Sequence, residues 1–181
     1  MGLEVERKYL VANECWRRHV GPGTPYVQGY VSVDPERSVR VRIAEGKATL
    51  NVKREVTSAI RDEFEYPIPA EDADQILASI CIQPLVEKTR YTVQAGDLKW
   101  EIDEFSGANR GLVIAEVELE DDRRQIVAPD WVGEEVTGDP RYFNINLVKH
   151  PYSEWANGER ANGVPLDAKR IRPRRAPPNC E

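Results

Sequence analysis

The chain has 181 residues, of which 40% are hydrophobic, and a formal net charge of −6. This length suits one domain with a real core and is short for two. An acidic chain makes a poor general binder of nucleic acid or of anionic membranes, so we expect neither as a partner. Basic residues gather in residues 160–181, where six Lys or Arg stand against two acids.

The start of the sequence carries acids where a secretory signal peptide would need a basic segment followed by an apolar one. No stretch approaches the ~20 apolar residues of a membrane-spanning helix. The three cysteines form no CxxC pair, so a zinc-finger spacing is absent from the sequence. We therefore expect a cytoplasmic protein.

Alternation of apolar and polar residues with a period of two dominates the sequence up to residue 120 and predicts a mainly β domain. Turn residues such as Asp34-Pro35 and Ala95-Gly96-Asp97 stand where hairpins would need them, which indicates an antiparallel meander. Eight strands are predicted, at residues 3–11, 26–33, 37–44, 47–56, 60–68, 87–95, 98–105 and 111–120.

Helical patterns occur in a few shorter segments. PAEDADQILASICI, residues 69–82, places acids in a first turn and then apolar residues on one face, which predicts a helix on the outside of the sheet. Further short helices are predicted after a cap at Asn13, over Asp122–Val127 and over Tyr142–Lys149.

The segment after Gly158 combines prolines with arginines, a composition typical of disorder. We therefore assign residues 1–158 to one domain and residues 159–181 to a basic, Pro-rich tail.

Charged residues fall on one face of each predicted strand. In EVERK, residues 4–8, Glu4, Glu6 and Lys8 share a face, opposite Val5 and Arg7. A half-exposed sheet with a wet, charged face is the simplest explanation, but such a face tends to mix its signs. Here the signs are largely separated between strands. Bases recur at Arg40 and Arg42, at Lys53, and at Lys88 and Arg90. Acids recur at Glu63 and Glu65, which share their face with Arg61, at Glu101 and Asp103, and at Glu116 and Glu118.

If the strands curl into a closed barrel, this face becomes a polar lumen with an acidic wall and a basic wall. Carboxylates without a cation would repel one another and raise their pKa values, so the lumen is predicted to hold a metal ion. Arginine forks and lysine point charges suit a short polyphosphate. In this interpretation Glu4 and Glu6 hold a divalent metal, and Lys8 contacts phosphate beside them.

A set of motifs in a fixed order resembles those of a known family. EVERK matches the ExExK signature of the CYTH superfamily, the triphosphate tunnel metalloenzymes, and the ordered set is more specific than that signature alone. The resemblance spans about residues 3–150 and is greatest to the compact bacterial members that hydrolyse inorganic triphosphate. The further motifs are QGY at 28–30, RVR at 40–42, Lys53, DEFE at 62–65, EKTRY at 87–91, EIDEF at 101–105, VELE at 117–120, GEEVT at 133–137 and RYFN at 141–144.

The resemblance implies an eight-stranded antiparallel closed β-barrel, a triphosphate tunnel, with helices packed outside and Mg²⁺ or Mn²⁺ as cofactor. Its metal-ligand positions match Glu4, Glu6, Asp103, Glu116 and Glu118. Its phosphate-binding positions match Lys8, Arg40, Arg42, Lys53, Lys88 and Arg90, and Arg61 shares their face and joins the substrate-binding set. Glu4, Glu6 and the six matched basic residues form the predicted catalytic set.

The function implied is hydrolysis of inorganic triphosphate to pyrophosphate and phosphate by a metal-activated water. Other reactions on the same scaffold remain open: hydrolysis of thiamine triphosphate or nucleoside triphosphates, cyclisation of ATP as in class IV adenylyl cyclases, and binding of polyphosphate without catalysis. These alternatives differ at the tunnel mouth, which strand periodicity does not resolve. The expected partner is a small triphosphate, and the expected state is a monomer or homodimer.

Overall fold

A computed structural model describes residues 5–34, 37–57, 60–119, 121 and 123–156, with side chains for all of these except 5, 19, 55–57 and 60–62. The predicted metal ligand Glu4 and the predicted tail, residues 159–181, lie outside the described residues. Among the described residues, no helix is long and apolar enough to cross a membrane.

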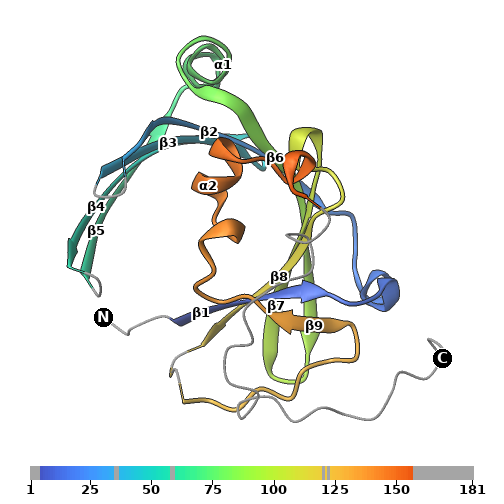
Figure 1. Cartoon of the computed structure of the whole chain (residues 1–181). Coiled ribbons are helices and arrows are strands. Elements are labelled where there is room, and N and C mark those ends of the chain that lie inside the picture. Colours follow the sequence, from blue (N-terminus) through green and yellow to red (C-terminus); the bar gives the residue numbers. More distant parts are fainter. Residues whose placement is uncertain (1–4, 35–36, 58–59, 120, 122, 157–181) are drawn as a thin grey trace.

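The main element is one strongly curved nine-stranded sheet whose neighbouring strands are antiparallel (Figure 1). The strand order is β5-β4-β3-β2-β6-β7-β8-β1-β9. The strands are β1 (Val5–Val11), β2 (Thr24–Val33), β3 (Arg37–Ala44), β4 (Lys47–Thr57), β5 (Ile60–Ile68), β6 (Ile82–Ala95), β7 (Leu98–Phe105), β8 (Val113–Leu119) and β9 (Val132–Glu135).

The sheet is not closed, because β5 and β9 stand at the two ends of the strand order and no pairing of described residues joins them. The predicted strands and their antiparallel order are therefore confirmed, whereas the predicted closure is not. The ninth strand escaped prediction because its four residues are too few for a period of two to stand out. It pairs with β1, with Tyr9 opposite Glu135.

The convex face of the sheet is apolar and is covered in two places. Helix α1 (Ala70–Ser79) packs its buried Ala73 and Leu77 against Val41 of β3 and Ala48 of β4. Figure 1 shows this helix outside the curve of β2 and β3, which confirms its predicted position. Because Val41 faces outward, its neighbour Arg40 must face the concave side.

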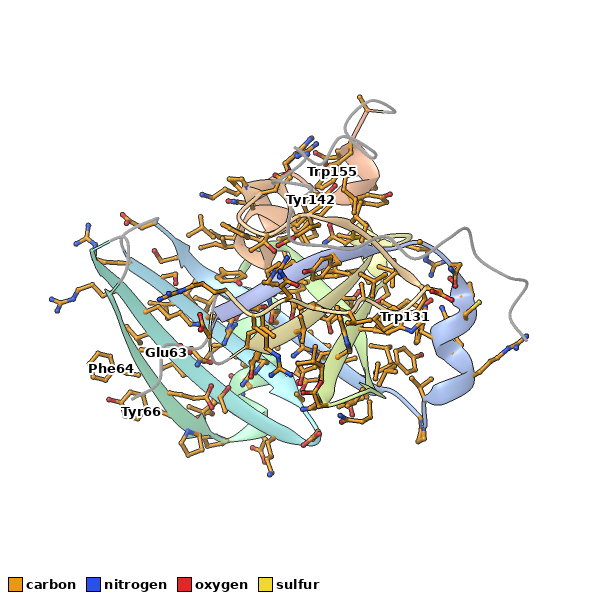
Figure 2. All side chains as sticks on the ribbon, turned by 90° about the horizontal axis from the view of Figure 1, so that it is seen from below. Glu63, Phe64, Tyr66, Trp131, Tyr142 and Trp155 are labelled. Atoms are coloured by element: carbon orange, nitrogen blue, oxygen red, sulfur yellow. The ribbon has the colours of Figure 1, made fainter. Side chains whose placement is uncertain are left out.

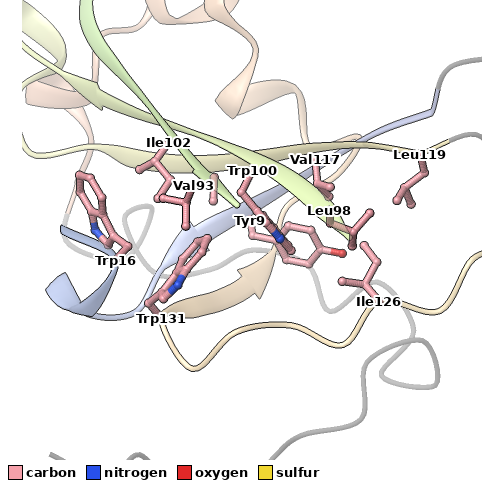
Figure 3. Close-up of a cluster of buried hydrophobic side chains, with 11 residues drawn as sticks. Tyr9, Trp16, Val93, Leu98, Trp100, Ile102, Val117, Leu119, Ile126 and Trp131 are labelled. Atoms are coloured by element: carbon pink, nitrogen blue, oxygen red, sulfur yellow. The ribbon is translucent and has the colours of Figure 1, made fainter. Parts of the chain in front are cut away.

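An aromatic cluster covers the convex face of the other half of the sheet (Figure 3). It includes Tyr9 of β1, Trp100 of β7 and Trp131, which directly precedes β9. Trp16, from the 3₁₀ helix η1 (Glu14–His19), also belongs to it. Asn13 caps η1 as predicted, since its side chain accepts a hydrogen bond from the amide of Cys15 at 2.9 Å.

The predicted helix over Asp122–Val127 is wrong for the residues that the structure describes there, 123–127, which form a turn and a short bridge. Ile126 in this segment is 3% exposed and packs into the aromatic cluster. Packing of Ile126 against residues distant in the sequence, rather than helix propensity, determines the local backbone conformation.

The last described elements are η3 (Pro140–Tyr142), α2 (Asn144–Lys149) and η4 (Tyr152–Glu154). Helix α2 lies inside the curve of the sheet (Figure 1), so the prediction that the helices pack outside is wrong for this one. Its Leu147 and Val148 belong to a buried cluster with Val86 of β6, Phe105 of β7 and Ile114 of β8.

The sequence of the strands explains this position of α2. Val86, Phe105 and Ile114 each lie two residues from a charged residue of the concave face, namely Lys88, Asp103 and Glu116. The concave face is therefore apolar at one end and charged in the middle, and the apolar end needs a partner. Helix α2 is that partner.

Candidate active site

The concave face of the sheet holds a charged cavity of about 610 Å³. Twelve of its 19 lining residues are strand positions that alternation assigned to the charged face, so these twelve side chains lie on the concave side as predicted. They are the bases Lys8, Arg40, Arg42, Lys53, Lys88, Arg90, Lys99 and Arg124, the acids Glu6, Glu63, Glu65, Asp97, Glu101, Glu116 and Glu118, and Tyr26, Gln28, Leu98 and Asn144.

Strand β5 shows the two faces directly. Figure 2 shows Glu63 turned toward the inside of the curve, whereas Phe64 and Tyr66 project from the outer side at this edge of the sheet. Arg61 belongs to the same strand, with its backbone opposite Glu55 in the hairpin, and its side chain lies outside the described part. Its predicted role in binding substrate stays a prediction.

A network of ion pairs ties β6 to β7 and β8. Arg90 of β6 lies directly opposite Asp103 of β7, and its Nε and Nη2 donate to the two carboxylate oxygens at 2.7 and 2.6 Å. The Nη2 group also donates to Glu116 at 2.8 Å, and Nη1 contacts Glu101. Lys88 contacts the same carboxylate of Asp103, and both residues are almost completely buried.

This network corrects the prediction of separate acidic and basic walls. Strand β6, which carries two of the predicted phosphate-binding residues, stands next to β7, which carries acids. In an antiparallel pair, residues directly opposite share a face, so their side chains meet. Lys88 and Arg90 therefore have carboxylate partners within the wall itself.

Strand β1 completes this wall. Lys8 lies opposite Glu116 of β8, and its ammonium contacts both Glu116 and Glu6. Glu6 lies opposite Glu118, so the three glutamates belong to two adjacent strands. The predicted residues Glu6, Lys8, Glu116 and Glu118 are thus brought together at one place in the cavity.

The charges of this cluster shift one another's pKa values. Burial alone would raise the pKa of Glu116, but Lys88, Lys8 and Arg90 lower it to about 2. Burial and the nearby Glu116 raise the pKa of Glu6, although Lys8 opposes this. Glu116 is therefore a carboxylate at any ordinary pH, and Glu6 takes up a proton more readily than an isolated glutamate.

The predicted metal ligands are only partly assembled. Glu6, Glu116 and Glu118 line the cavity, whereas Asp103 lies beneath it with both oxygens accepting from Lys88 and Arg90. Among the described residues, no group of three or more His, Cys, Asp or Glu side chains has the arrangement of a metal site.

The wall formed by β3, β4 and β5 is more open. Arg42 donates to Glu65 at 3.2 Å, and Lys53 lies 3.0 Å from Glu63. Asn51 of β4, which is fully buried, donates to both of these glutamates. It stands two residues before Lys53, so strand periodicity could have placed it on this face.

Arg40 differs from the other predicted phosphate-binding residues. It makes no ion pair with any residue that the structure describes, and its Nε is buried without a hydrogen-bond acceptor among them. A buried donor without an acceptor costs free energy, which an anion in the cavity would recover. Arg40 is therefore the clearest sign that this cavity takes an anion.

A second cavity of about 480 Å³ adjoins the first and shares Glu6, Lys8, Arg40 and Lys53 with it. It continues between α2 and the β3–β4 wall to Lys149, so α2 narrows the concave space without filling it. At the other side, Asp97 and Arg124 form an ion pair between the β6–β7 turn and the loop before β9. Sequence reasoning missed these two residues because loops carry no period.

A curved antiparallel sheet with a charged concave face defines the fold class of this protein. Comparison of the sequence with known protein families identifies that class. The family description "CYTH domain" matches residues 2–152, and the chain belongs to this family.

Two relatives are named inorganic triphosphatase. The one from Acetivibrio thermocellus is 47% identical over 155 residues, covering 86% of this chain and 99% of the relative. The one from Nitrosomonas europaea is 33% identical over 150 residues, covering 80% and 96%. The crystal structure of the inorganic triphosphatase NE1496 superposes with a TM-score of 0.64 at 30% identity, over 82% of this chain and 95% of that one.

A putative adenylate cyclase from Bacillus halodurans is a more distant match, with a TM-score of 0.53 at 18% identity over 67% of this chain and 84% of that chain. At this identity the likeness extends to the fold alone.

Proposed function

We propose that this protein hydrolyses inorganic triphosphate to pyrophosphate and phosphate with the help of a divalent metal ion. The observation that carries the proposal is the charged cavity, and above all the buried Nε of Arg40, which has no acceptor among the described residues. The two relatives named inorganic triphosphatase, which match most of this chain, support the same substrate.

The lining of the cavity favours an inorganic substrate over an organic triphosphate. Among the described lining residues of the larger cavity, Tyr26 is the only aromatic one. Arg90 and Lys88 lie over its ring, at 5.4 and 5.9 Å from the centroid. A ring whose face is occupied by cations is a poor platform for stacking a nucleobase or a thiazole.

The acids of the cavity fit Mg²⁺ or Mn²⁺, because both prefer carboxylate oxygens and Glu116 is held ionised. Glu6, Glu116 and Glu118 would hold the ion, and we keep Glu4 as a further ligand. The ion, when bound, supplies neutralisation of phosphate charge and a more acidic water.

The basic residues divide the work of binding. Arg40, Arg42 and Lys53 reach the anion from the β3–β4 wall, and Lys8 and Arg90 reach it from the β1–β6 side. Such donors stabilise the charge that develops on the equatorial oxygens in phosphoryl transfer. Glu63 and Glu65 now contact Lys53 and Arg42, and the substrate would take their place.

We further propose that the sheet closes into a tunnel around the bound triphosphate. Because β9 pairs with β1 only at Tyr9 and Val11, β5 would approach the start of β1. Both strands already face the same cavity through Glu63, Glu65 and Glu6. A metal ion between them would offset the repulsion of these carboxylates, and the polyanion would pair with the basic residues of both walls. The predictions of a cytoplasmic monomer or homodimer belong to the same proposal.

The test is phosphate release by the purified full chain from inorganic triphosphate, ATP, thiamine triphosphate and pyrophosphate, each with Mg²⁺, Mn²⁺ or EDTA. We expect fast cleavage of inorganic triphosphate that EDTA abolishes, and slow cleavage of the others. A preference for an organic triphosphate would move the specificity to the cavity mouth. Failure to release phosphate from any of the four would contradict the proposal.

A further inference from the structure

A buried ion pair lies on the convex side of β1, directly behind the cavity. Arg7 is 3% exposed, and its Nε donates to Oε1 of Glu135 at 2.9 Å while Nη2 contacts the other oxygen. Arg7 stands between Glu6 and Lys8, which line the cavity on the opposite face. The contact therefore joins the strand that carries two site residues to a residue 128 positions away.

The ion pair continues through Thr137 to the backbone of Lys8. The hydroxyl of Thr137 donates to Oε1 of Glu135 at 2.8 Å and accepts the amide hydrogen of Lys8 at 3.0 Å. The amide of Val136 donates to the carbonyl of Lys8 at 2.8 Å. Both backbone groups of Lys8 are therefore held by residues 136 and 137.

A side chain has replaced part of the strand ladder at this point. The pairing of β9 with β1 shifts register between Tyr9 and Val11, and β9 itself ends at Glu135. Without Thr137, the amide of Lys8 would lose its acceptor on this edge of β1. The orientation of the hydroxyl depends in turn on Glu135, whose carboxylate is fixed by the two-pronged contact with Arg7.

The same segment also positions the helix on the other side of the cavity. After Thr137 the chain turns at Gly138, which has a φ of +76°, and enters η3 and α2. Asn144 of α2 lines both cavities. The segment thus connects β1, which carries Lys8, to α2, which lines the cavity through Asn144.

We propose that Arg7, Glu135 and Thr137 are positioning residues for hydrolysis, which act by holding Lys8 in place between Glu6 and Glu116. The inference rests on the proposed function, in which Lys8 contacts phosphate. The ammonium of Lys8 reaches both glutamates at once, so a small displacement of β1 would break one contact. Displacements of about 1 Å are enough to cost a large part of a catalytic rate.

The sharpest variant is Thr137→Val, which removes the hydroxyl and keeps the shape of the side chain. We expect kcat/KM for inorganic triphosphate at saturating Mg²⁺ to fall about tenfold, the loss expected for one buried backbone hydrogen bond. Thr137→Ser, which keeps the hydroxyl, should stay within about twofold of the wild type.

A double-mutant cycle separates positioning from general loss of structure. In a Lys8→Ala background, assayed at high enzyme concentration, Thr137→Val should change kcat/KM less than about twofold, because the group that it positions is gone. In an Arg42→Ala background it should still cost about tenfold, since Arg42 lies on β3 and contacts Glu65 instead.

The outcomes are distinguishable. An equal loss in the wild-type and Lys8→Ala backgrounds would show a merely structural role and overturn the proposal. So would wild-type kcat/KM for Thr137→Val with its thermal unfolding unchanged. Wild-type turnover in Lys8→Ala alone would instead remove Lys8 from the proposed site, and the positioning role with it, while leaving the network a structural feature.

Discussion

The two walls of the cavity are held together in different ways. In the wall of β6, β7, β8 and β1, the side chains of Lys88 and Asp103 are 3% and 1% exposed, and Arg90 has three carboxylate partners. In the wall of β3, β4 and β5, Lys53 and Glu63 are 37% and 47% exposed and form a looser pair. The first wall is preorganised, whereas the second can exchange its carboxylates for phosphates.

Removing one partner of the buried pair should have the largest effect on stability. Asp103→Asn leaves Lys88 buried beside Arg90 without its main counter-charge, so we expect a loss of about 3–5 kcal/mol in the free energy of unfolding. Urea unfolding followed by circular dichroism measures it. Glu63→Gln is the matched control on the open wall and should cost about 0.5 kcal/mol or less. Equal losses in the two variants would end the distinction between the walls.

Glu116→Gln tests the preorganised wall for function. The variant keeps the size of the side chain but removes a carboxylate that three basic residues hold ionised. We expect turnover of inorganic triphosphate to fall about 100-fold at saturating metal, with a weaker apparent affinity for Mg²⁺. A titration of rate against Mg²⁺ measures both quantities. Turnover at the wild-type level would remove Glu116 from the metal site.

Arg40→Ala tests the open wall. Since Arg40 makes no ion pair with a described residue, its loss should leave the unfolding free energy almost unchanged. Losing a charge-assisted contact to phosphate should lower kcat/KM about 10- to 100-fold, partly through a higher KM. Steady-state kinetics and a thermal melt together provide the check. A large loss of stability with an unchanged KM would mean that Arg40 supports the sheet and not the substrate.

An ion pair away from the cavity provides the reference for small effects. Burial alone would raise the pKa of Asp139, which caps η3, but its contacts with Arg141 lower that pKa below the ordinary value. A carboxyl with a lowered pKa stabilises the fold above its unfolded pKa of about 3.9 and loses this as the pH falls through its folded pKa.

Asp139→Ala should therefore cost about 1 kcal/mol at pH 7. The difference from the wild type should disappear in acid, below the folded pKa of Asp139. Unfolding curves at several pH values test this sign, and a difference that grows in acid would refute the assignment.

Strand periodicity was enough to place the charged face of the sheet. The alternation in SVRVRI puts Arg40 and Arg42 on one side and Val41 on the other, as the structure has them. The family resemblance then supplied roles for the residues on that side. The face of each residue and its match to a family motif can both be determined from a few consecutive residues, without knowing which strands are neighbours.

What could not be predicted depends on which strands are neighbours. The pairing of Arg90 with Asp103 needs β6 next to β7 in a given register, and periodicity assigns only the face of each strand. The position of α2 depended on an apolar end of the concave face that is assembled from three different strands. Arg7 was assigned to the face away from the site, and its link to Glu135 crosses 128 positions.

The place of β1 in the sheet has a consequence for synthesis. Lys8 meets Glu116 across 108 positions, and β1 has no partner strand until β8 and then β9 have been made. Contacts between such distant positions form slowly, because a long loop must be closed first. While the chain emerges from the ribosome, β2 to β7 can pair with one another, but β1 stays unpaired until β8 has been made. The charged cavity is therefore incomplete in the nascent chain, and it is complete only after β1 has paired with β8.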